Sequence, residues 1–120
     1  MQKNIGDPEK IVTQHINSFL VNSLEGVLSD YTNESVLMTQ DANYTGVEEI
    51  RGFFSGLLPH FPLQGSKMEL DKIVANGEVV YIVWHAKTPS LEVPLATDTF
   101  VIKEGKIHRQ TFAGQLNFIR

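Results

Sequence analysis

The sequence predicts a single α+β domain in which helices come first and an antiparallel sheet follows. Apolar residues recur with helical spacing in the first half of the chain, and from Lys67 onward they recur with a period of two. A chain of 120 residues can bury one hydrophobic core but not two. We therefore expect residues 1–120 to form one domain, with three N-terminal helices packed on one face of a curved sheet.

The first two helices are expected before residue 31. Asp7 followed by Pro8 is typical of a helix start, because the aspartate caps free backbone N–H groups and proline fits the first helical turn. The apolar spacing then continues to about Asn22. A second, short helix is expected over Leu24–Asp30, where Leu24, Val27 and Leu28 would share one face.

A short strand and a third helix are expected next. The strand would span Ser35–Gln40, after Asn33 breaks the helical pattern. The segment Thr45–Glu48 matches a capping box, in which the threonine and the glutamate cap each other's backbone. It would open a helix that Pro59 ends.

The sheet is expected as a meander of four strands in the second half of the chain. Asn76-Gly77 is the strongest hairpin signal, because both positions of its tight turn need positive φ angles. Thr88-Pro89-Ser90 and Glu104-Gly105 are the other two turns. The strands would span Lys67–Ala75, Glu78–Lys87, Leu91–Lys103 and Lys106–Gly114.

The strand Glu78–Lys87 predicts a second subunit. Its alternate residues are apolar on both faces, with Val80, Ile82 and Trp84 on one and Tyr81, Val83 and His85 on the other. The helices cover only one face, so we expect a two-fold homodimer through an outer sheet face that carries Val80, Ile82 and Trp84. The alternative is an apolar face left exposed to solvent.

Composition excludes several function classes. Fourteen acidic residues against ten basic ones, a formal charge of −4, argue against a nucleic-acid partner. The chain has no cysteine, and its four histidines lack metal-site spacing, so we expect no metal and no cofactor. Neither a signal peptide nor an apolar run of membrane-spanning length is present, so we expect a cytoplasmic protein without a membrane partner.

Three segments resemble one known superfamily: Leu24–Val36, Tyr44–Phe54 and Asp98–Ile107. They are similar to the nuclear transport factor 2-like proteins, which include ketosteroid isomerase and the SnoaL-like polyketide cyclases. The resemblance implies a cone-shaped, cystatin-like fold that encloses a pocket. Because the superfamily includes isomerases, dehydratases, cyclases, epoxide hydrolases and non-catalytic binders, the resemblance implies little about the activity.

Asp98 is the first candidate for chemistry. It shares strand parity with Ala96, Phe100 and Ile102, so its carboxyl would point into an apolar interior. Burial would raise its pKa and make it an acid, or a donor to an oxygen that gains charge. The resemblance implies the same, because Asp98 falls where ketosteroid isomerase keeps its protonated oxyanion-hole aspartate. The alternative is a surface aspartate with a partner.

The resemblance also implies roles for three other residues. His15 takes the place of the family's oxyanion-hole tyrosine, and Thr39 takes that of the catalytic base aspartate. A threonine cannot remove a carbon-bound proton at neutral pH, so steroid isomerisation is not expected unless Asp41 supplies the base. His15 would either form a carboxylate–imidazole couple with Asp98 or serve as a hydrogen-bonded core residue.

Two functions remain open at this point. The first is a cofactor-independent isomerase or cyclase that acts on a small apolar, carbonyl-containing molecule. The second is a non-catalytic ligand-binding or dimerisation module. Either ligand would lie in an apolar cavity, and core packing alone would explain most of the aromatic side chains. The residues expected to line that cavity are Phe19, Phe54, Tyr81, His85, Phe100, His108, Gln110 and Phe112.

Overall fold

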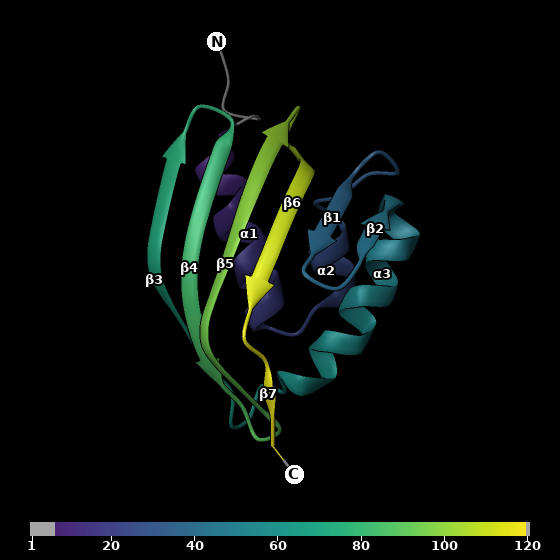
Figure 1. The fold of residues 1–120 in the computed structure, drawn as a ribbon. Helices are drawn as coiled ribbons and strands as arrows, with labels where there is room; N and C mark the ends of the chain where they lie inside the picture. The colour runs from purple at the N-terminus through teal and green to yellow at the C-terminus, as the bar shows by residue number, and fades with distance from the viewer. Residues whose placement is uncertain (1–6, 120) are drawn as a thin grey trace.

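The computed structural model describes residues 7–119, which form helices packed on one face of a curved, open sheet (Figure 1). The α+β class predicted from the sequence is confirmed. The helices are α1 (Pro8–Leu20), α2 (Leu24–Leu28) and α3 (Gly46–Leu57), followed by a 3-10 helix over Leu58–His60. The strands are β1 (Val36–Thr39), β2 (Asn43–Thr45), β3 (Lys67–Asn76), β4 (Val79–Lys87), β5 (Leu91–Lys103), β6 (Lys106–Gly114) and β7 (Asn117–Phe118).

The helix starts follow mostly from local capping. The side chain of Asp7 accepts a hydrogen bond from the Lys10 amide, and that of Ser23 caps α2. The expected capping box before α3 is wrong in detail: Thr45 makes no side-chain cap, and its amide donates to Glu49 instead of Glu48. Among residues 7–119, no helix has the length and apolar character needed to cross a membrane.

The sheet has the strand order β2-β1-β6-β5-β4-β3, and β7 pairs with β5. The expected antiparallel meander runs from β3 to β6. The sequence reasoning missed β2 and β7, and it did not foresee that β1 pairs in parallel with β6. This pairing places β1, which follows α2 in the chain, next to β6 (Figure 1).

The face of β4 that meets the helices is the opposite of the expected one. Val80, Ile82 and Trp84 are buried beneath the helices, whereas Val79 and Tyr81 are 41% and 37% exposed on the outer face. The fully apolar alternate set forms the core, and the set that contains Tyr81 and His85 faces outward, because buried polar groups need partners. The homodimer stays a prediction, and Val80, Ile82 and Trp84 are not part of its surface.

Register shifts curl the sheet. They occur in the pairings β3–β4, β4–β5 and β5–β6, and such bulges increase the local twist and bend of a strand. In β6, Ile107 pairs with Ile102 and Arg109 pairs with Val101, so His108 is the extra residue. The curved sheet and the helices enclose the interior that holds the candidate site.

Candidate functional site

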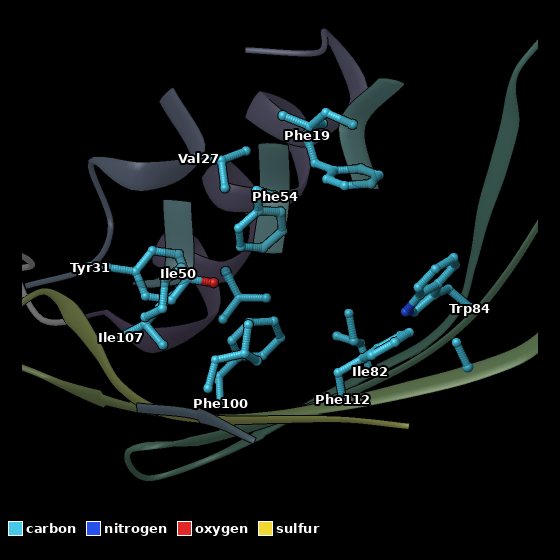
Figure 2. Close-up of a cluster of buried hydrophobic side chains, with 14 of the residues drawn as sticks. Phe19, Val27, Tyr31, Ile50, Phe54, Ile82, Trp84, Phe100, Ile107 and Phe112 are labelled. Atoms are coloured by element: carbon cyan, nitrogen blue, oxygen red, sulfur yellow. The ribbon is translucent and has the colours of Figure 1, made fainter. Parts of the chain in front are cut away.

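A cavity lies between α1, α3 and the concave face of β3 to β6. Its volume is about 50 Å³, and its lining is mostly aromatic and aliphatic. Figure 2 shows Phe19, Phe54, Phe100 and Trp84 directed into the space between the helices and the sheet. Three polar side chains reach the wall: His15 from α1, Asp98 from β5 and Gln110 from β6. The cavity is therefore an apolar site with its polar groups gathered on one side.

Asp98 occupies the interior position predicted from its strand parity. Its residue is 7% exposed, and each carboxyl oxygen accepts one hydrogen bond. The indole Nε1 of Trp84 donates to Oδ1 over 2.8 Å, and Nε2 of Gln110 donates to Oδ2 over 2.9 Å. Among residues 7–119, Asp98 is the only carboxyl-bearing residue that lines this cavity.

Burial raises the pKa of Asp98 from 3.8 to about 6. The hydrogen bonds from Trp84 and Gln110, together with the charge of His15, act in the opposite direction but do not cancel the burial. With this pKa, roughly nine-tenths of the group is ionised at pH 7. At neutral pH, Asp98 is therefore mainly a proton acceptor and not the neutral acid expected from the sequence.

A continuous hydrogen-bonded row connects Asp98 to the outside of the site. We name it the polar row, and it consists of Asp30, His15, Tyr31, Gln110 and Asp98. Nδ1 of His15 lies 3.0 Å from Oδ2 of Asp30, and Nε2 lies 3.2 Å from the hydroxyl of Tyr31. Tyr31 donates to Oε1 of Gln110, whose Nε2 donates to Asp98. His15 and Asp98 are thus linked indirectly, through two other side chains.

Tyr31 remains protonated at the centre of this row. Burial raises its pKa well above the ordinary value, and the nearby carboxyls of Asp98 and Asp30 raise it further. The row begins near the surface, because the Asp30 side chain keeps 15% of its accessible area. It ends at the cavity wall, where Asp98 is buried.

Five of the eight expected lining residues do line the cavity: Phe19, Phe54, Phe100, Gln110 and Phe112. The expectation is wrong for Tyr81 and His85, which lie on the outer face of β4. His85 instead contacts the carboxylates of Asp71 and Glu69, at 2.8 and 3.6 Å. The hydrogen bond that His85 donates to Asp71 and the two negative charges raise the pKa of His85, although partial desolvation lowers it.

His108 is the third error in the expected lining. The bulge at His108 breaks the alternation of β6, so that Ile107 and Gln110 are both buried. His108 itself is half-buried and lies outside the cavity. Strict alternation along the strand predicts that His108 lies on the same face as Gln110 and Phe112, but the bulge removes it from that face.

Thr39 and Asp41 do not reach the cavity. The hydroxyl of Thr39 accepts hydrogen bonds from the amides of Asp41 and Ala42, over 3.1 and 3.0 Å, and so closes the turn between β1 and β2. Asp41 is exposed in that turn. The expected positioning and base roles of these two residues are therefore wrong, because the turn that follows Thr39 carries both groups away from the interior.

Sequence reasoning missed three hydrogen-bonding members of the site. Tyr31 and Asp30 follow α2 in a short connection, where periodicity says nothing about direction. Trp84 was placed on the wrong face of β4. The register of β4 and β5 would have placed Trp84 correctly. Ile82 pairs with Asp98, paired residues share a face of the sheet, and Trp84 lies on the same face as Ile82. Within residues 7–119, no group of three or more His, Asp and Glu side chains is arranged to hold a metal ion.

Comparisons with known proteins show the fold. No family model and no curated protein matches the chain. SalBIII, an epoxide hydrolase/cyclase-like enzyme with a role in pyran ring formation in polyether salinomycin, is a similar solved structure. Its TM-score is 0.78 at 15% identity, over 94% of this chain and 96% of that one.

Two further solved structures agree with this result. A candidate polyketide cyclase from Sinorhizobium meliloti has a TM-score of 0.73 at 18% identity, over 92% of this chain and 99% of its own. An NTF2-like protein of unknown function from Cytophaga hutchinsonii has a TM-score of 0.72 at 10% identity, over 96% and 93% of the two chains. The protein therefore has the cone-like fold of the SnoaL-like and NTF2-like proteins, as its sequence predicts.

Proposed function

We propose that the protein is a cofactor-independent isomerase or cyclase that binds a small apolar molecule with a carbonyl group. The observation that carries this proposal is Asp98, a buried carboxyl on the wall of an apolar cavity with a pKa of about 6. Such a group accepts a proton at neutral pH and returns it without a large barrier. The similar proteins described as cyclases support the proposal at the level of fold.

The proposed step begins with ionised Asp98. Its carboxylate removes a proton from the carbon next to the ligand's carbonyl, and the electron pair of that C–H bond moves onto the carbonyl oxygen as an enolate. The Gln110 amide has two N–H groups, of which one binds Asp98. The second is the donor that we assign to the enolate oxygen. Asp98 then returns its proton to the far carbon of a conjugated enolate. Alternatively, the enolate carbon attacks a second carbonyl carbon of the ligand to close a ring, the C=O π electrons move onto that oxygen, and Asp98 gives its proton to it.

The size of the cavity limits the ligand. Its 50 Å³ is well below the ~300 Å³ or more of most ligand sites, so it fits only the reacting end of a molecule. A second cavity, of about 40 Å³, shares Phe19 and Met68 with the first. We propose that the remainder of the ligand extends toward this second cavity. Among residues 7–119, Phe19 and Met68 are the only residues that line both cavities.

The test is hydrogen–deuterium exchange at the carbon next to the carbonyl of 2-cyclopentenone and of cyclopentanone, followed by NMR in D₂O. We expect the wild-type protein to accelerate exchange over buffer, and Asp98→Asn and Asp98→Leu to lose about 100-fold or more of that acceleration. Asp41→Asn is the matched control, because Asp41 is exposed and lies outside the cavity. Equal exchange by wild type and both Asp98 variants contradicts the proposal.

A non-catalytic binding module is the second candidate, and the small cavity volume favours it. In that case, the same two ketones would shift the NMR signals of residues around the cavity without any exchange above buffer. Asp98→Leu would then bind as tightly as the wild type or more tightly, since an apolar side chain suits the rest of the wall. Binding and exchange measured on the same samples separate the two functions.

A further inference from the structure

The directions of the hydrogen bonds in the polar row define a protonation state. A tyrosine hydroxyl carries one proton, and that of Tyr31 is donated to Oε1 of Gln110. The contact of 3.2 Å between Tyr31 and His15 therefore needs a proton on Nε2 of His15. On the other side of the ring, Nδ1 faces the carboxylate of Asp30 at 3.0 Å. With the hydrogen bonds in these directions, the row is satisfied by a doubly protonated His15 together with an ionised Asp98.

The same side chains also fit together in the reverse direction. If Asp98 carries a proton, it can donate to Oε1 of Gln110 once the amide is turned over. The amide N–H then donates to Tyr31, and Tyr31 donates to Nε2 of His15, which must be unprotonated. Nδ1 of His15 still donates to Asp30. In both arrangements, the row and its two ends hold the same number of protons.

The other two protonation states leave a mismatch. With both His15 and Asp98 unprotonated, Tyr31 faces two acceptors and can satisfy only one. With both protonated, a turned amide and His15 both donate to the oxygen of Tyr31, and the proton of Tyr31 is left without an acceptor in the row. Buried polar groups without matching partners are costly. Aromatic side chains surround the His15 ring, which lies edge-on to Tyr31, Phe54 and Phe100, with centroids 5.4, 6.0 and 5.8 Å away.

We propose that Tyr31 and Gln110 couple Asp98 to His15, so that the buried pair holds one proton, which resides on either side chain. In the ligand-free protein, a proton gained by Asp98 is matched by loss to solvent of the proton on Nε2 of His15, while Nδ1 keeps its proton and its contact with Asp30. No proton crosses the amide, which only turns. The titratable groups that face the pair are Asp30 and Tyr31, and both belong to the polar row.

This inference deepens the proposed function and rests on it for its purpose. In the ligand-free protein, a protonated His15 accompanies the ionised form of Asp98 that the proposed step needs, and the unturned Gln110 amide then has its second N–H free for the ligand's oxygen. The pair of Asp98 and His15 would keep a net charge of zero in both arrangements, so neither arrangement leaves one of the two side chains as an isolated buried charge. Tyr31 is a positioning residue in this scheme, whereas Gln110 both transmits the coupling and contacts the ligand's oxygen.

The test is an NMR titration of the ligand-free, full-length chain. The ¹⁵N signals of the His15 ring report its protonation across the pH range, in four proteins: wild type, Asp98→Asn, Tyr31→Phe and the double variant. An asparagine can mimic the protonated carboxyl, because its amide donates to Gln110. We expect Asp98→Asn to lower the midpoint of the His15 titration by about one pH unit or more when Tyr31 is present. In the Tyr31→Phe background, we expect less than half of that shift.

The cycle separates coupling through the row from direct attraction between charges. An equal shift in both backgrounds would overturn the proposal, because a through-space interaction does not need the Tyr31 hydroxyl. Tyr44→Phe is the matched control, since it removes a hydroxyl from another aromatic side chain packed against Phe53. It should leave the coupling intact. Gln110→Met, in place of Tyr31→Phe, gives the same test if the first variant does not fold.

The measurement uses no ligand, so the two proposals fail independently. If the coupling is found without ketone exchange, the coupling proposal stands and the proposed enzyme activity is wrong. If ketone exchange is found without the coupling, the proposed enzyme activity stands and the coupling role of Tyr31 and Gln110 is wrong.

Discussion

The indole N–H of Trp84 donates to Oδ1 of Asp98 over 2.8 Å, across the pairing of β4 with β5. Because this hydrogen bond favours the ionised carboxyl, it lowers the pKa of Asp98 against the effect of burial. We expect Trp84→Phe to raise the pKa of Asp98 above about 6. A titration of the ¹³C carboxyl signal of Asp98 measures the change, and an unchanged or lower pKa would show that the indole does not stabilise the charge.

The stability of the protein should fall as the pH rises through the range from about 4 to 6. Asp98 has a folded-state pKa of about 6, against 3.8 in its ordinary state, so the folded protein binds more protons than the unfolded chain in that range. The stabilising effect is complete below pH 3.8 and is lost above pH 6. The shift corresponds to about 3 kcal/mol of unfolding free energy.

Replacement of Asp98 by asparagine isolates this effect. Other carboxyls also titrate in this range, so the informative quantity is the difference between wild type and Asp98→Asn. We expect Asp98→Asn to gain about 3 kcal/mol relative to wild type between pH 4 and pH 8, measured by urea unfolding. Asp41→Asn should show no such gain, because Asp41 is exposed. A pH-independent difference would mean that Asp98 is not held in a raised-pKa environment.

Gly114 lies where β6 approaches β5 too closely for a side chain. A Cβ at this position would come within 2.9 Å of the Ala96 Cβ and 3.2 Å of the Phe112 ring. We therefore expect Gly114→Ala to destabilise the protein by about 1–3 kcal/mol and to shift Phe112 toward the cavity. Gly52→Ala is the control, because no atom lies within 4 Å and alanine favours the helix. Equal stability of the two variants would contradict the close approach.

The fold was predictable because its main signals are local. The change of period near Lys67 marks the start of the sheet. A tight turn follows Asn76 as expected, but its two loop residues are Gly77 and Glu78, with Gly77 at a φ of +60°. The interior placement of Asp98 also follows from local alternation, because β5 is regular around that residue. These features depend only on neighbours in the chain.

The errors in the site arise where distant segments decide the outcome. The choice of which face of β4 meets the helices depends on packing between elements, and periodicity cannot decide it when both faces carry apolar residues. The bulge at His108 depends on the pairing of β6 with β5, and this one extra residue takes His108 out of the alternation that Gln110 and Phe112 follow. The polar row joins α1, the connection after α2, β6 and β5, so no spacing in the sequence could show it.

Met68 and Phe19 separate the two small cavities, so truncation of Met68 should join them. We expect Met68→Ala to bind the apolar dye 1-anilinonaphthalene-8-sulfonate about tenfold more tightly than wild type, because the merged space can take one ring of the dye. Val74→Ala is the control: it shortens a side chain on the same strand that is 44% exposed. Near-ultraviolet circular dichroism of both variants shows whether the core remains packed. If Met68→Ala keeps its packed core and the dye affinity does not change, the two cavities are not parts of one ligand site, and the reacting end of the ligand must enter between α1 and α3 instead.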